Sequence, residues 1–216
     1  MLNYKKKYKY TKIKLIFFLL VYMFVNSCKK NEDQVEFYLL KNRVVSTEGI
    51  PVQQYAKLKK IENFESIKYC TFDTVKKQLI YGGKFTVNQN DFQDEPLVTN
   101  NEIIKLDLQK SEFVLSESAR NKISHIKPSM KYGVQFVILV NKKPCLTGYF
   151  RSNISSYIYN WNYIGYDYYN NNIEALRDEN FVIRQNADYE KWKPVLTNLK
   201  NYPELIDAMK NSNRLK

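Results

Sequence analysis

The fold is decided by one stretch in the second half of the chain: Val134-Gln135-Phe136-Val137-Ile138-Leu139-Val140, then Asn141-Lys142-Lys143-Pro144, then Cys145-Leu146-Thr147-Gly148-Tyr149-Phe150. The first run is almost entirely apolar and has the length of one strand buried in a sheet. The polar residues after it form a turn, and a second apolar run returns. The sequence therefore predicts an antiparallel hairpin with buried strands.

The segments around this hairpin predict a mixture of short strands and helices. Ser116 is a typical N-cap, and Ala119, Ile123 and Ile126 recur at helical spacing before Pro128, which predicts a helix from Glu117 to Ile126. Further strands are expected at Val35–Leu40, Ile67–Phe72, Phe113–Leu115 and Ser155–Tyr163, and further helices at Gln54–Ile61, Thr74–Tyr81, Tyr189–Leu199 and Pro203–Met209. Ile173–Val182 fits either a helix or a pair of strands.

These elements predict one α+β domain over residues 35–216, with a mainly antiparallel sheet and helices packed on one face. The segment lacks an internal repeat and a linker rich in Pro, Gly or Ser, so no second domain is indicated. Its length is sufficient for a hydrophobic core.

The N-terminus has the pattern of an export signal. Six lysines and no acidic residue occur in residues 1–14, and Leu15 to Val25 is an unbroken apolar run. A basic segment followed by a short apolar one is typical of a secretory signal peptide, whereas a spanning helix needs about 20 apolar residues. We therefore expect residues 1–27 to be a signal peptide rather than a membrane span.

The end of that segment resembles the lipobox of bacterial lipoprotein precursors. Val25, Ser27 and Cys28 match the pattern, and Asn26 takes its variable position. The resemblance implies lipidation of Cys28 and cleavage before it, with residues 28–34 as lipidated cysteine and tether. It also implies a location in the cell envelope, on the outer membrane, facing the periplasm or the exterior. Lys29–Asp33 is either a solvated linker or a surface-export signal.

The net charge of +12 belongs largely to the signal peptide. Removing residues 1–27 leaves 28 of the 34 basic residues against 22 acidic ones, a net charge of about +6. These charges are scattered along the chain, so a nucleic-acid partner is not indicated.

The two cysteines other than Cys28 leave two alternatives open. The export compartment permits a disulfide between Cys70 and Cys145. Both cysteines also have apolar neighbours in the sequence, so two buried free thiols are an equal alternative.

The segment from Leu97 to Ser156 resembles a group of small envelope lipoproteins. The similarity lies in Pro96-Leu97-Val98-Thr99, Phe113-Val114-Leu115-Ser116, the apolar strand at 134–140 and Gly148-Tyr149-Phe150. The order of elements is more distantly similar to the periplasmic head of the Sec accessory translocation protein. That likeness implies a ferredoxin-like arrangement of the α+β fold and carries no functional residue.

No catalytic, metal or cofactor motif stands out in the sequence. His125 is the single histidine, without the partners of a triad or a zinc site. Acidic pairs such as Asp94/Glu95, Glu102/Asp107, Glu32/Asp33 and Asp178/Glu179 could in principle serve a hydrolase, but none lies in a known motif. We expect no cofactor and no bound metal.

The segment Tyr157–Tyr169 is the one candidate for ligand binding. Tyr157, Tyr159, Trp161 and Tyr163 alternate along the expected strand and would share one face. Tyr and Trp dominate many binding hot spots, but the same face could simply cover the core.

Taken together, the sequence favours a lipid-anchored, non-enzymatic envelope protein that contacts another envelope protein or a surface ligand. A glycan- or peptide-binding lipoprotein that uses Tyr157–Tyr169 is the first alternative, and an extracytoplasmic hydrolase is the second.

Overall fold

The computed structural model describes residues 33–60, 69–157, 159–166, 181–188 and 193–216. The chain divides into two compact units, Met1–Glu32 and Asp33–Lys216, and all described residues belong to the second. The predicted signal peptide, Cys28 and most of the tether therefore lie outside the described residues.

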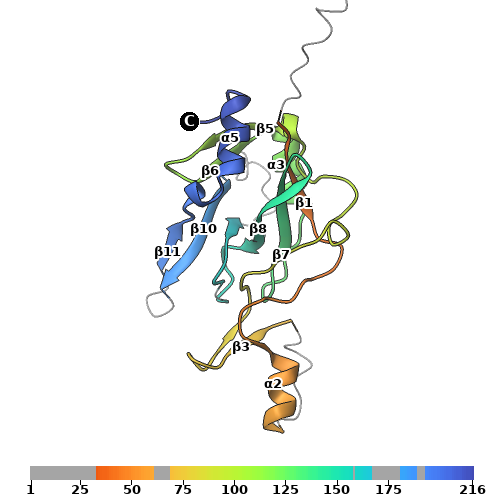
Figure 1. The fold of residues 1–216 in the computed structure, drawn as a ribbon, viewed down its shortest axis with the longest axis vertical. Helices are drawn as coiled ribbons and strands as arrows, with labels where there is room; N and C mark the ends of the chain where they lie inside the picture. Colours follow the sequence, from red (N-terminus) through yellow and green to blue (C-terminus); the bar gives the residue numbers. More distant parts are fainter. Residues whose placement is uncertain (1–32, 61–68, 158, 167–180, 189–192) are drawn as a thin grey trace, which may run out of the picture. The chain divides into compact units, whose positions relative to one another are not determined.

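An eight-stranded sheet forms most of the described fold (Figure 1). Its main path is β1 (Val35–Leu39), β7 (Val134–Val140), β8 (Lys143–Ser152), β9 (Tyr163–Tyr166), β10 (Phe181–Asp188), β6 (Glu112–Leu115) and β5 (Ile103–Asp107); β11 (Lys193–Leu196) also pairs with β10. Every pair is antiparallel except β8 with β9. The predicted α+β class with a mainly antiparallel sheet is confirmed.

The main path of this sheet begins at β1 and ends at β5, and the sheet nearly closes into a barrel. The outer edges of both strands are covered by other segments. The N–H of Phe37 in β1 donates to the carbonyl oxygen of Val98 at 2.9 Å, just before the segment that leads into β5. The outer edge of β5 is paired with the C-terminus, where the N–H of Leu106 donates to the carbonyl oxygen of Arg214 at 2.8 Å. The outer edges of β1 and β5 therefore leave few backbone groups open to a second chain.

The predicted hairpin is confirmed, with a tighter turn than expected. β7 has the predicted bounds, and Val140 pairs directly with Lys143. The turn therefore has only two residues, Asn141 and Lys142, and both have positive φ angles of 51° and 65°. Two such residues form the turn that matches the twist of paired strands, and asparagine tolerates the first position.

The main core fills the inner face of this sheet. Phe37 and Phe113 meet edge to face at 5.0 Å, and Phe136 and Phe150 lie 4.7 Å apart. Two helices add apolar side chains to the same core: α3 (Glu117–Ser124) through Ala119 and Ile123, and α5 (Pro203–Asn211) through Leu205, Ala208 and Met209.

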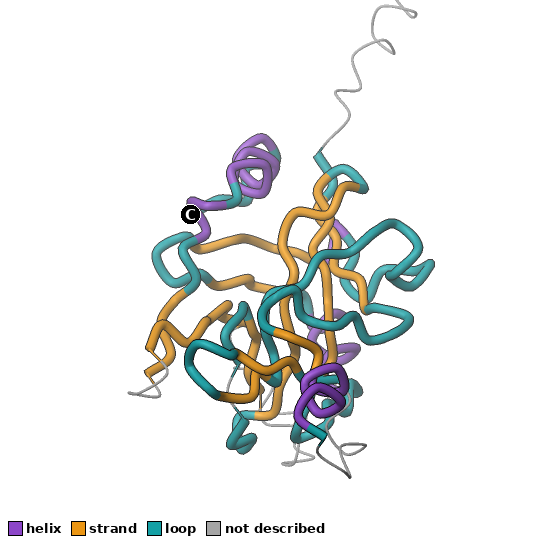
Figure 2. Tube along the Cα trace, turned by 60° about the horizontal axis from the view of Figure 1, so that its bottom comes forward, coloured by secondary structure: helices purple, strands orange, loops and turns teal. Residues whose placement is uncertain are grey.

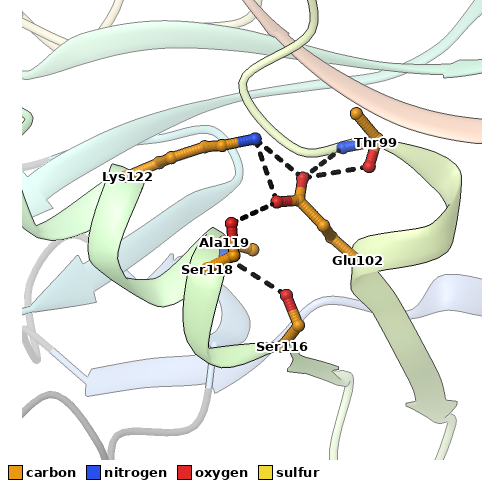
Figure 3. A network of polar contacts seen from close by, with 6 residues as sticks. All are labelled: Thr99, Glu102, Ser116, Ser118, Ala119 and Lys122. Atoms are coloured by element: carbon orange, nitrogen blue, oxygen red, sulfur yellow. Dashed lines mark hydrogen bonds and ion pairs between the residues drawn. The ribbon is translucent and has the colours of Figure 1, made fainter.

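Polar contacts fix the start of α3 (Figure 3). Ser116 is its N-cap, as predicted, and accepts a hydrogen bond from Ala119 N–H at 3.2 Å. Glu102 belongs to the 3₁₀ turn η2 (Asn100–Glu102) and accepts hydrogen bonds from Thr99 N–H and Ser118 Oγ. The Nζ of Lys122 lies 2.9 Å from the Oε1 of Glu102. Burial opposes ionisation of Glu102, but these contacts outweigh it and lower its pKa to about 2.

A smaller sheet of β2 (Ile50–Pro51), β3 (Thr71–Asp73) and β4 (Gln78–Ile80) packs with α2 (Val52–Lys59). Tyr55 of α2 stacks on Phe72 of β3 at 4.1 Å. This part lies at the opposite end of the described fold from α5, as Figure 1 and Figure 2 both show.

Three sequence predictions of local structure are wrong. Thr74–Tyr81 is a turn and a strand rather than a helix, because Asp73 Oδ1 caps the N–H groups of Val75 and Lys76 in a hairpin turn. Within Tyr189–Leu199, Lys193–Leu196 is a strand on the edge of β10, where a proline is tolerated. Most of Ser155–Tyr163 is irregular, and the strand begins only at Tyr163. Residues 173–180 lie outside the described part.

Candidate functional site

Two adjoining cavities lie along the first half of β8, with volumes of about 560 and 660 Å³. They share four lining residues: Pro144 and Cys145 of β8, and Asn201 and Tyr202 at the junction of η4 (Leu199–Asn201) and α5. We call the two cavities together the β8 groove. The volume of each cavity is in the range of pockets that hold ligands.

The groove exists because β9 pairs with only part of β8. The parallel ladder begins at Tyr149 opposite Tyr163 and runs to Ser152. From Lys143 to Thr147, the one strand among the described residues that pairs with β8 is β7. The register also shifts between Ile138 and Leu139, which leaves Cys145 as an extra residue between the pairs made by Pro144 and Leu146. Such a bulge leaves a residue without a ladder partner.

The smaller cavity is aromatic. The indole Nε1 of Trp161 donates a 2.9 Å hydrogen bond to Thr147 Oγ1, and the same hydroxyl donates to the carbonyl oxygen of Phe85 at 3.1 Å. The ammonium of Lys84 lies 5.1 Å from the indole centroid, a cation–π distance. Trp161 is therefore held in one orientation at the wall of the cavity.

A buried amide connects this wall to Tyr202. The Nδ2 of Asn162 donates to the Tyr202 hydroxyl at 2.9 Å and to the Thr147 carbonyl oxygen at 3.1 Å, and its Oδ1 accepts from Thr197 Oγ1. Asn162 is almost fully buried, and burial raises the pKa of Tyr202 above its ordinary value. Both aromatic walls are thus positioned by hydrogen bonds before any ligand arrives.

The larger cavity is acidic. Asp33, Glu204 and Asp207 line it, and Lys143 is the one cation among its described lining residues. Asp33 is fixed by hydrogen bonds from Asn141 Nδ2 at 2.8 Å and Asn211 Nδ2 at 2.7 Å. Glu204 and Asp207 are exposed on one side of α5, and no lysine or arginine within the described ranges forms an ion pair with either.

The four aromatic residues predicted to share a strand face are divided between the interior and the surface. Tyr159 and Tyr163 are buried in a second apolar cluster with Tyr149 and Phe85, so they serve packing. Tyr157 is half-buried, 4.5 Å from Tyr81. Only Trp161 lines the groove. The predicted segment therefore contributes one of its four residues to the site.

A second cluster of tyrosines surrounds Arg43. Its guanidinium carbon lies 5.1 to 5.8 Å from the ring centroids of Tyr69, Tyr132 and Tyr149. The guanidinium also donates to the carbonyl oxygens of Tyr81 and Tyr132. A shallow cavity of about 280 Å³ lies beside it. Because the guanidinium already contacts three tyrosine rings and donates hydrogen bonds to two carbonyl oxygens, we infer that this cluster stabilises the fold rather than binding a ligand.

The other residues considered for chemistry are placed apart or engaged elsewhere. Cys70 and Cys145 are both free thiols; the former is buried directly before β3 and the latter lines the groove. His125 is exposed at the end of α3. The acids Asp94, Glu102 and Asp107 each pair with a different lysine, and Glu32, Asp178 and Glu179 lie outside the described residues. Within the described ranges, no three His, Cys, Asp or Glu side chains gather at a metal-binding distance.

Comparison with known proteins gives no relative: no family model, curated protein or solved structure matches the chain. Among the residues that the structure describes, no helix is both long and apolar enough to cross a membrane.

Sequence reasoning missed Tyr202, Thr147 and Asn162, which complete the groove with Trp161. Tyr202 comes directly before the predicted last helix, and Thr147 lies in the predicted hairpin, so the elements were foreseen. No spacing in the sequence links residues 147, 161 and 202, because only the packing of η4 against β8 brings them together.

Proposed function

We propose that this chain is a lipid-anchored protein of the cell envelope, held at the outer membrane, whose folded domain binds a partner in the β8 groove. The anchor is supported by the lipobox pattern that ends at Cys28. A ferredoxin-like relationship is likewise proposed, on the order α3–β7–β8 alone. The kinship with small envelope lipoproteins remains a proposal of the same kind.

The observation that carries the binding role is the pre-formed groove. Its aromatic walls are held by hydrogen bonds through Thr147 and Asn162, so they lose little side-chain freedom when a ligand binds. Rigid aromatic side chains with polar neighbours are typical of binding surfaces. The partner is another envelope protein or a surface ligand such as a peptide or glycan.

The hydrolase alternative has weaker support. General acid catalysis near neutral pH needs a carboxyl group whose pKa is raised by shielding from water. Glu204 and Asp207 line the groove but are exposed. We therefore rank hydrolysis below binding.

The anchor is tested with three matched cysteine variants in cells fed a labelled fatty acid. Cys28→Ser abolishes labelling and releases the protein from the membrane fraction, because the acyl chains provide the membrane affinity. Cys70→Ser and Cys145→Ser retain full labelling. Unchanged labelling of the Cys28 variant would refute the anchor.

The binding role is tested with a photo-crosslinking residue at Asn201, which is exposed and lines both cavities. We expect a discrete adduct in intact cells, and no such adduct from the same residue at Lys57 on α2. Trp161→Ala weakens the Asn201 adduct while the protein stays folded. Equal adducts at both positions would remove the groove from the proposal.

A further inference from the structure

We propose that the β8 groove binds an extended peptide with a basic side chain, which adds to the open edge of β8 as an extra strand. This inference rests on the proposed binding function and specifies the ligand.

The first observation is the direction of the backbone groups on β8. The N–H of Tyr149 donates to the Asn162 carbonyl oxygen at 3.0 Å, and the carbonyl oxygen of Thr147 accepts from the Asn162 side chain at 3.1 Å. At both positions the backbone polar groups therefore point away from β7. A side-chain amide at Thr147 takes the place that a neighbouring strand would fill.

The second observation is that no strand of the described residues pairs with the edge beyond Asn162. β9 does not reach Thr147, and Cys145 is the bulged residue without a partner on β7. The groove runs along this stretch, since Pro144, Cys145 and Thr147 line it. An open strand edge is the surface to which extended peptides add by main-chain hydrogen bonds.

The length of the edge sets the length of the ligand. The four residues from Lys143 to Leu146, beyond the Thr147 carbonyl that Asn162 occupies, span about 13 Å at the usual rise of a strand. That distance accommodates four or five residues of an extended peptide.

The charges at the two ends indicate the side chains of the ligand. Glu204 and Asp207 lie at the acidic end without ion-pair partners among the described residues, and the fixed Asp33 lies beside them. The carboxylates of Glu204 and Asp207 attract a cation, so a lysine or arginine side chain fits this end. The other end carries Lys84, which suits an acidic side chain.

A peptide fits these features better than a glycan does. Stacking of a sugar needs an open aromatic face, but Lys84 lies over the indole of Trp161, and the indole N–H is already bonded to Thr147. The backbone of the bulged Cys145 and the carbonyl oxygen of Pro144, which has no N–H, are in contrast matched by another backbone.

The test uses the acylated full-length protein in detergent micelles and two libraries of fluorescent, end-blocked pentapeptides. The central residue is Lys in one library and Glu in the other, and the remaining positions are mixtures of Val, Thr, Ser and Tyr. We expect the Lys library to bind about fivefold more tightly, as two exposed ion pairs allow. The combined change Glu204→Gln and Asp207→Asn removes that preference, whereas Glu95→Gln, which changes an exposed acid outside the groove, leaves it intact.

A third library carries the central Lys with alternate backbone N-methylation, which keeps the side chains but blocks main-chain hydrogen bonds. We expect it to bind at least about tenfold more weakly. Equal binding of the methylated library, equal binding of the Lys and Glu libraries, or binding of none of them would overturn the inference. A glycan that competes at Asn201 would also overturn it. In each of these cases, a specific adduct at Asn201 would still support the proposed binding function. Loss of that adduct would instead contradict the binding function itself.

Discussion

The guanidinium carbon of Arg43 lies 5.1 Å from the ring centroid of Tyr132, and its Nη1 donates a 2.7 Å hydrogen bond to the carbonyl oxygen of the same residue. Its Nη2 donates to the carbonyl oxygen of Tyr81, directly after β4, at 3.1 Å. One side chain thus connects the segment after β1, the end of the small sheet and the turn before β7.

We expect Arg43→Lys to destabilise the protein by about 2 kcal/mol, because a lysine ammonium cannot reproduce the planar fork that serves two carbonyl groups and three rings. Urea unfolding followed by circular dichroism measures the change. Lys127→Arg, at an exposed position, is the matched control and stays within about 0.5 kcal/mol of the wild type. A loss for Arg43→Lys no larger than that of the control would contradict the role of Arg43.

The Glu102 network makes part of the stability dependent on pH. Its folded-state pKa of about 2 is below the value of about 4.3 for an unfolded glutamate, so ionised Glu102 stabilises the folded state. That contribution is fully present above about pH 5 and is lost as the pH falls toward 2. We expect Glu102→Gln to cost about 2 kcal/mol at pH 7 and much less at pH 3. The difference in unfolding free energy between variant and wild type, measured at both values, tests this; a difference that does not change with pH would be inconsistent with it.

Two buried tyrosines give a matched pair of substitutions. The Tyr149 hydroxyl donates to the Gly83 carbonyl oxygen at 2.8 Å, whereas the buried Tyr159 hydroxyl has no hydrogen-bond partner among the described residues. Tyr149→Phe is therefore expected to cost about 1 to 2 kcal/mol, and Tyr159→Phe to be neutral or slightly stabilising. Thermal unfolding of the two variants shows which substitution costs more stability. A larger loss for Tyr159→Phe would show that its hydroxyl has a partner.

The thiols of Cys145 and Cys70 are expected to be alkylated slowly, Cys145 before Cys70. Burial, and next the charge of Glu204, raise the pKa of Cys145 to about 11, and burial does the same for Cys70. Because the thiolate is the reactive form, alkylation of the folded protein at pH 8 is slow and accelerates as the pH rises. Cys145 reacts first, since Cys70 has no exposed surface. Peptide mass mapping without reductant locates each label, and a crosslinked pair of these two cysteines would refute the free-thiol assignment.

Some elements could be predicted because their signal is local. The bounds of β7 follow from its apolar run, the start of α3 follows from Ser116, and the last helix follows from its apolar spacing after Pro203. Asp73 shows the limit of such signals. Its carboxylate caps two backbone N–H groups in a turn, as it would at the start of a helix, and the sequence around it did not distinguish the two.

The sequence by itself determined the fold class and the central hairpin, because both depend on residues that are neighbours in the chain. The export signal and its lipobox are predictions of the same local kind, and they lie outside the described residues. The tertiary structure alone decided the parallel pairing of β8 with β9, the burial of Tyr159 and the groove between Trp161 and Tyr202. These arise where segments far apart in the sequence meet, and a periodic pattern along the chain carries no information on which distant residues become neighbours.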